Sequence, residues 1–96
     1  MESCVPVLLI RHKVTNYETW KQAFLEDGST REANGARGGR FFRSDVDSSE
    51  VWILLEWDDL FRARLFVKSD DLSEAIVRGG VTDHPDYWFL EDSDRP

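Results

Sequence analysis

Alternating and continuous apolar runs along the chain predict four β-strands. The first run, Val7-Leu8-Leu9-Ile10, continues into an alternation of charged and apolar residues. The run Val51-Trp52-Ile53-Leu54-Leu55-Glu56-Trp57 gives the strongest strand pattern, because it is β-branched, aromatic and nearly apolar on both faces. Gly38-Gly39 marks a turn or a close backbone approach before the second strand. The four strands are predicted over residues 5–14, 40–43, 51–57 and 87–90.

Helical spacing of apolar residues predicts two helical regions between the strands. Tyr17, Trp20 and Phe24, followed by Gly28 and Arg31, recur on one side of a helix over residues 17–34. Its N-cap is Asn16, its stop is Gly35, and Gly28-Ser29-Thr30 weakens its middle. The second region follows a cap at Asp58 or Asp59 and is interrupted by Ser69-Asp70-Asp71, which can cap a short third helix ending at Gly79-Gly80.

The order strand, helix, strand, strand, helix, strand is the ferredoxin-like, split βαβ plan of an α+β fold. We therefore expect one domain over residues 1–96, with a core over about 5–91, a four-stranded antiparallel sheet, and an acidic, frayed tail over 91–96. Helices would cover one face of the sheet only. The other face carries few polar residues, so we expect a second copy of the chain to cover it in a homodimer.

Composition narrows the classes of function. The chain has 96 residues, 41% of them hydrophobic, and a net charge of −7. Such an acidic chain repels phosphate backbones and anionic lipids, so we expect neither nucleic-acid nor membrane binding. The longest apolar run is too short to span a membrane. Cys4 is the single cysteine, which excludes an internal disulfide and fits a cytoplasmic location.

His12 is the first candidate for chemistry. The even-numbered residues from Leu8 to Val14 share one face of the first strand, and this face is expected to meet the helices because Arg11 and Lys13 cost more to bury. An imidazole on an apolar wall can act as a base that draws a proton from a phenol or an enolisable carbon. The alternative is a core or interface histidine satisfied by one hydrogen bond.

Two other titratable residues favour structural interpretations. His84 lies in a polar loop without further ligands at a definable spacing, so no metal site is predicted. Glu56 interrupts an apolar strand and is expected to form a structural ion pair at the sheet or dimer interface, with Arg11, Lys13, Arg40 or Arg43 as the possible partner. A raised pKa and a catalytic role for Glu56 is the alternative.

The aromatic residues supply candidates for a binding site. Most of them should be ordinary core, but aromatic rings that line a cavity would suit a planar aromatic ligand. The candidate substrate-binding residues are Tyr17, Trp20, Phe24, Trp57 and Phe66.

Three segments together resemble a known family. They are Val14-Thr15-Asn16-Tyr17-x-x-Trp20-Lys21-x-x-Phe24, Gly38-Gly39-Arg40-Phe41-Phe42-Arg43 and Leu54-Leu55-Glu56-Trp57-Asp58-Asp59. The chain is similar, from about residue 7 to 91, to a branch of the dimeric α+β barrel superfamily often labelled "cyclase", beside the antibiotic-biosynthesis-monooxygenase domains. The resemblance implies two sheets that face each other across a dimer and, in many relatives, an apolar cavity between sheet and helices.

The resemblance also implies a range of activities. Some relatives oxidise polyketide phenols with oxygen and no cofactor, others cyclise polyketides, and others degrade haem. Aligned on the haem-degrading branch, Phe66 stands at its Trp position, Ile76 at its axial His position and His12 near its Asn position, so haem chemistry is not expected. Asp27 stands where relatives often carry a first-helix His, which argues against a base at that position.

The sequence thus predicts a small-molecule enzyme, either a cofactor-independent monooxygenase or a cyclase, acting on an aromatic or polyketide-like substrate. His12 would transfer the proton, an apolar cavity would orient the substrate, and no cofactor is expected. The alternative is a non-catalytic homodimeric domain that binds a small hydrophobic ligand or serves as an accessory domain.

Overall fold

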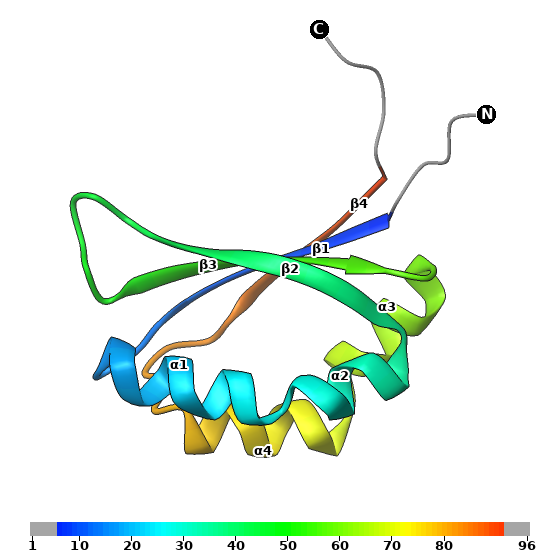
Figure 1. The fold of residues 1–96 in the computed structure, drawn as a ribbon. Coiled ribbons are helices and arrows are strands. Elements are labelled where there is room, and N and C mark those ends of the chain that lie inside the picture. Colours follow the sequence, from blue (N-terminus) through cyan, green and yellow to red (C-terminus); the bar gives the residue numbers. More distant parts are fainter. Residues whose placement is uncertain (1–5, 92–96) are drawn as a thin grey trace, which may run out of the picture.

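Four antiparallel strands form one sheet, and all the helices lie against one of its faces (Figure 1). The computed structural model describes residues 6–91. The strand order is β2-β3-β1-β4, so β1 and β3 occupy the centre and the sheet is antiparallel throughout. The strands are β1 (Pro6–Lys13), β2 (Ala36–Arg43), β3 (Glu50–Trp57) and β4 (Asp86–Glu91).

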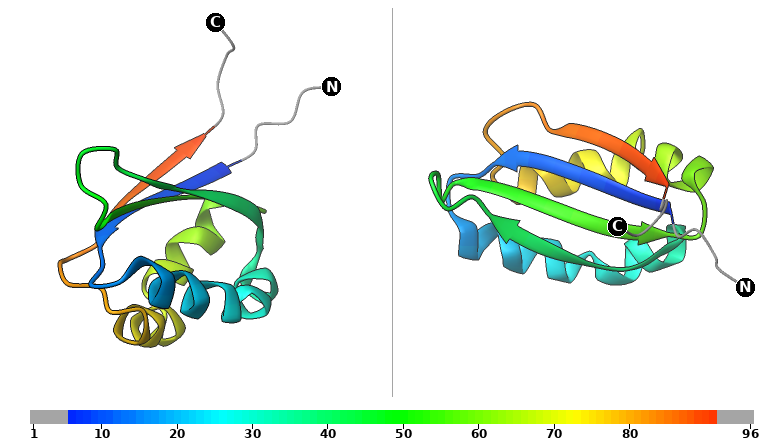
Figure 2. Two further views of the ribbon diagram at one scale, coloured as in Figure 1. Left: turned by 60° about the vertical axis from the view of Figure 1, so that its left-hand side comes forward. Right: turned by 90° about the horizontal axis from the view of Figure 1, so that it is seen from above.

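The helices form a second layer beneath the sheet, and the opposite face of the sheet is uncovered (Figure 2). The expected ferredoxin-like α+β fold is confirmed by this arrangement. The helices are α1 (Tyr17–Glu26), α2 (Gly28–Asn34), α3 (Leu60–Val67) and α4 (Asp70–Arg78). None of the helices in the described part of the chain has the length and apolar character needed to cross a membrane.

The single helix predicted over residues 17–34 is wrong in one respect, because it is two helices. Asp27 separates α1 from α2, and its backbone N–H donates back to the Phe24 carbonyl as a cap. Gly28 starts α2 immediately afterwards, consistent with the weak Gly28-Ser29-Thr30 segment. The break lies at residues that become part of the candidate site.

The second strand begins earlier than predicted, at Ala36, so Gly38-Gly39 lies inside β2 and is not a turn. The register with β3 shifts between Ala36 and Gly38, which identifies a bulge. A Cβ on Gly39 would lie 2.2 Å from the backbone oxygen of Leu54. The alternative of a close backbone approach is therefore the correct one at Gly39.

The predicted helix caps are largely confirmed. The Asn16 side chain accepts a hydrogen bond from the Thr19 N–H, and Asp59, rather than Asp58, accepts one from Arg62. Ser69 accepts from the Leu72 N–H and so starts α4. Cys4 and the end of the predicted tail lie outside the described residues.

The two faces of the sheet differ sharply. The face toward the helices is buried, and it contains His12 at 5% exposure, as predicted. The uncovered face, here called the open face, shows large apolar side chains to solvent, with Phe42 42%, Trp88 39% and Leu90 46% exposed. The buried face comprises Leu8, Ile10, His12, Val51, Ile53, Leu55 and Trp57.

Candidate functional site

An internal cavity of about 40 Å³ lies between the sheet and the helices. This volume holds a few water molecules, since one water needs roughly 10–15 Å³ measured in this way. Residues of the strands, aromatic side chains of α1 and α3, and residues of α4 line the cavity. Residues that line it include Ile10, His12, Ile53, Trp20, Phe24 and Ala75.

Two polar side chains of the sheet line this cavity, the imidazole of His12 on β1 and the phenol of Tyr87 on β4. Neither ring nitrogen has a hydrogen-bond partner among residues 6–91. The ring lies edge-on to Trp20, with 5.7 Å between the ring centroids. A buried imidazole without partners costs free energy, and a ligand in the cavity can offer it the hydrogen bonds that the protein does not.

Burial sets the protonation state of His12. Desolvation lowers its pKa from 6.5 to about 4, and the nearby charge of Asp83 opposes this shift only in part. The imidazole is therefore neutral at pH 7. It can accept one hydrogen bond and donate another, but it does not carry a resting positive charge.

The five predicted binding residues separate into two groups. Trp20, Phe24 and Phe66 line the cavity. Tyr17 and Trp57 do not line it. Tyr17 packs beside Trp20 and lies under the guanidinium of Arg43, and Trp57 is fully buried against Phe66. The structure thus brings His12 together with three of the five aromatics, and their roles in binding stay predictions.

Sequence reasoning missed the polar edge of the cavity. Asp27, Thr30 and Arg31, at the α1–α2 break, line it together with Asp71 of α4. Asp27 also forms an ion pair with Arg78 at the end of α4, which joins the two helices. The signal for Arg31 was its place on the apolar stripe of the predicted helix, where a cation is unexpected.

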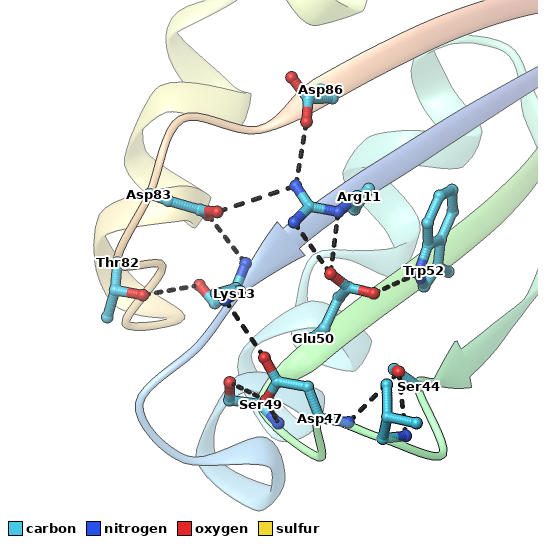
Figure 3. A network of polar contacts seen from close by, with 11 residues as sticks. Arg11, Lys13, Ser44, Asp47, Ser49, Glu50, Trp52, Thr82, Asp83 and Asp86 are labelled. Atoms are coloured by element: carbon cyan, nitrogen blue, oxygen red, sulfur yellow. Dashed lines mark hydrogen bonds and ion pairs between the residues drawn. The ribbon is translucent and has the colours of Figure 1, made fainter.

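A separate polar network occupies one end of the open face (Figure 3). Arg11 pairs with Glu50 at 2.9 Å and with Asp86 at 3.0 Å, and Glu50 also accepts the indole N–H of Trp52. Lys13 pairs with Asp47 at 3.2 Å. These charged groups are paired with one another, so we interpret the network as structural.

The ion pair expected for Glu56 does not form within the described sheet, and a pair at a dimer interface stays a prediction. Glu56 is exposed and forms no salt bridge within residues 6–91. The antiparallel register places Val7 and Gly38 opposite Glu56, whereas Arg11 lies four positions further along β1, within reach of Glu50. Across the same residues, no three side chains of His, Cys, Asp or Glu gather where they could hold a metal ion.

The comparisons with known proteins identify the fold. A candidate antibiotic biosynthesis monooxygenase from Bordetella bronchiseptica superposes with a TM-score of 0.80 at 12% identity, over 95% of this chain and 99% of that chain. A second such protein, from Caulobacter crescentus, superposes with a TM-score of 0.72 at 14% identity, over 95% of this chain and 92% of that chain. The N63A mutant of SnoaB, a cofactor-independent oxygenase from Streptomyces nogalater, superposes with a TM-score of 0.73 at 10% identity, over 97% of each chain.

Comparison with protein-family models finds no match, and comparison with curated proteins finds no significant one. The structural neighbours are antibiotic-biosynthesis-monooxygenase-like proteins, in agreement with the resemblance read from the sequence motifs. At these identities the likeness establishes a shared fold, while chemistry must be argued from the site itself.

Proposed function

We propose that the internal cavity binds a small aromatic or hydrophobic molecule, and that the chain is a cofactor-independent monooxygenase or cyclase in which His12 transfers the proton. One observation carries this proposal. A neutral imidazole, with neither nitrogen hydrogen-bonded within residues 6–91, lies on the wall of a cavity that is flanked by Trp20 and Phe24 and is polar only at its edge. SnoaB, which shares the fold, is a cofactor-independent oxygenase.

The low pKa of His12 determines how it would act. A phenol or an enolisable carbon in the cavity would give its proton to the free imidazole nitrogen, leaving a phenolate or an enolate beside an imidazolium. Because His12 is buried, the imidazolium is stabilised only while the new negative charge lies next to it. The phenolate is electron-rich and suits reaction with oxygen, whereas an enolate suits carbon–carbon bond formation in a cyclase.

Oxygen uptake with a panel of two- and three-ring phenols tests the oxygenase. His12→Gln should lower the rate by about 100-fold or more, since general acid–base catalysis contributes roughly 10²–10⁴-fold. His84→Gln is the matched control, because His84 is exposed in a loop. Equal rates in the two variants would remove His12 from the mechanism.

The cavity itself is tested by filling it. Ala75 faces the cavity from α4, so Ala75→Leu should abolish stabilisation of the protein by a bound phenol. Ser73→Leu, on an exposed position of the same helix, is the control and should leave that stabilisation intact. Equal ligand effects in both variants would place the binding site elsewhere.

A non-catalytic ligand-binding or accessory domain is the second candidate function. It is favoured by the absence, within residues 6–91, of any group that orients the His12 ring, because catalytic histidines are commonly held by a second hydrogen bond. This alternative predicts a rise in melting temperature with the same phenols and no product. Product formation by the wild type would exclude it.

We propose further that a second copy of the chain covers the open face. Apolar side chains at its centre, Leu9, Leu54 and Trp88, lie side by side across three strands. Light scattering should show a dimer at micromolar concentration, and Leu54→Glu should give a monomer. Leu25→Glu, which changes an exposed leucine of α1, should remain dimeric. A monomeric wild type would contradict the proposal.

A cytoplasmic location belongs to the same proposal. It rests on the single cysteine of the sequence, which offers no internal disulfide for an oxidising compartment to form. Fractionation of cells that produce the full chain tests it, and recovery outside the cytoplasm would overturn it.

A further inference from the structure

Arg31 carries a charge that has no ionic partner within the described residues. Its guanidinium carbon lies 3.6 Å from the centroid of the Phe24 ring, and its Nη1 donates to the Phe24 carbonyl at 2.7 Å. No carboxylate among residues 6–91 lies within salt-bridge distance of it. These contacts hold the cation against the wall of the cavity and half bury it.

The nearest carboxylates are engaged elsewhere or exposed. Asp27, four residues earlier, pairs with Arg78, and Glu32 is exposed on α2. Their charges reach Arg31 without contact, and burial is the stronger effect, so the pKa of Arg31 is lowered. A half-buried guanidinium with free N–H groups is a poor structural element and a good anion-binding group.

Arg31 also lies at a junction. Phe24, Arg31 and Leu55 line both the internal cavity and a second pocket of about 230 Å³. This second pocket lies between the α1–α2 break and β2, where Gly38 and Gly39 have no side chains to fill it. The internal cavity alone is much smaller than the roughly 150 Å³ that accepts a benzene ring. A ring needs more room than this, and outward movement of the Phe24–Arg31 wall would join the two spaces.

We propose that Arg31 is the anion-binding residue of the ligand site and that it selects aromatic carboxylates. The ring would lie across the junction toward His12, and the carboxylate would take the free N–H groups of the guanidinium, in the two-bond geometry that arginine favours. This inference rests on the proposed ligand-binding function and adds to it the charge of the ligand.

A matched pair of probes tests the inference. Calorimetry with the full chain compares 2-naphthoate with 2-naphthamide, which has a similar shape and no charge. We expect the naphthoate to bind about 10- to 100-fold more tightly, the range for hydrogen bonds to a charged group. Arg31→Gln should reduce naphthoate affinity to that of the amide and leave the amide unchanged.

Arg64→Gln is the matched control. Arg64 likewise stacks on an aromatic ring, 4.2 Å from the centroid of Phe89, but lines neither pocket. It should keep the full preference for naphthoate, although it loses the same charge. Arg31→Met, which retains the stem against Phe24, replaces Arg31→Gln if that variant fails to fold.

The outcomes separate this inference from the proposed function. If the wild type binds both probes equally, or if the preference survives in Arg31→Gln, the role of Arg31 is overturned. Loss of both probes in Ala75→Leu would then still support the ligand cavity. If the wild type binds neither probe at millimolar concentration, both proposals are overturned.

Discussion

The two faces of the sheet use the same strands for opposite purposes. On the helix-covered face, His12 is the one buried titratable side chain of the described residues, and its ring nitrogens, like the indole nitrogen of Trp57, have no partner there. On the open face, Arg11, Lys13 and Glu50 are each paired with a neighbour (Figure 3). The charged groups of the open face are thus paired with one another, whereas the imidazole of the covered face has no hydrogen-bond partner within the described residues.

This difference distinguishes structural polarity from functional polarity. A satisfied network at one end of a sheet stabilises the register of its strands and leaves few polar groups free to react or to bind a ligand. An unsatisfied imidazole in an apolar cavity lowers stability and offers hydrogen bonds to a ligand. The comparison makes His12, rather than the larger charged cluster, the residue on which a search for activity should concentrate.

The largest expected contrast comes from neighbouring residues of β3 that face opposite ways. Ile53→Ala should cost about 2–5 kcal/mol, because Ile53 is 1% exposed and its loss leaves a cavity. Leu54→Ala should lower the free energy of unfolding clearly less than Ile53→Ala does when the protein concentration is low. Urea unfolding at two concentrations measures both effects. A Leu54→Ala cost that grows with concentration would show that a second copy covers the open face.

The next contrast concerns pH. His12 has a pKa of about 4 when folded and 6.5 when unfolded, so the unfolded chain takes up the proton first as pH falls. Its contribution to stability is complete above pH 6.5 and declines toward pH 4, by about 3 kcal/mol. His12→Leu should remove this decline and raise stability at pH 7 by about 1 kcal/mol. Parallel stability curves for wild type and variant between pH 6.5 and 4 would contradict a buried, unpartnered imidazole.

The smallest effect is expected on the open face. Glu50→Gln removes the charge that Arg11 contacts while keeping an oxygen for the Trp52 indole, so it should cost about 1 kcal/mol or less. The difference should shrink in 1 M NaCl because salt screens partly exposed pairs. Thermal unfolding at low and high salt measures it. A cost of several kcal/mol, independent of salt, would show that the pair is part of a buried interface.

The predicted fold was correct because its information is local. Period-two and helical spacing, with caps at Asn16, Asp59 and Ser69, defined each element from its own residues. The errors lie where local information is ambiguous. A Gly-Gly pair is compatible with a turn or a bulged strand, and only the approach of the Leu54 carbonyl to Gly39 decides between them.

The candidate site was predicted in part. Alternation along β1 placed His12 on the covered face, since a charged neighbour costs more to bury than an imidazole. The same reasoning could not separate cavity residues from core, so Trp57 and Tyr17 were grouped with Trp20 and Phe24. Whether an aromatic ring borders a void depends on how closely neighbouring elements pack. The distance between two elements is not encoded in the spacing of residues along one of them.

The sequence by itself determined the order of the elements, the ferredoxin-like plan and the face on which His12 lies, because hydrophobic periodicity and caps act over a few residues. Tertiary structure alone decided that Arg11 pairs with Glu50 and that Arg31 stands between two pockets. These features join residues far apart in the chain, and their energies depend on desolvation and distance, which arise only when the layers pack.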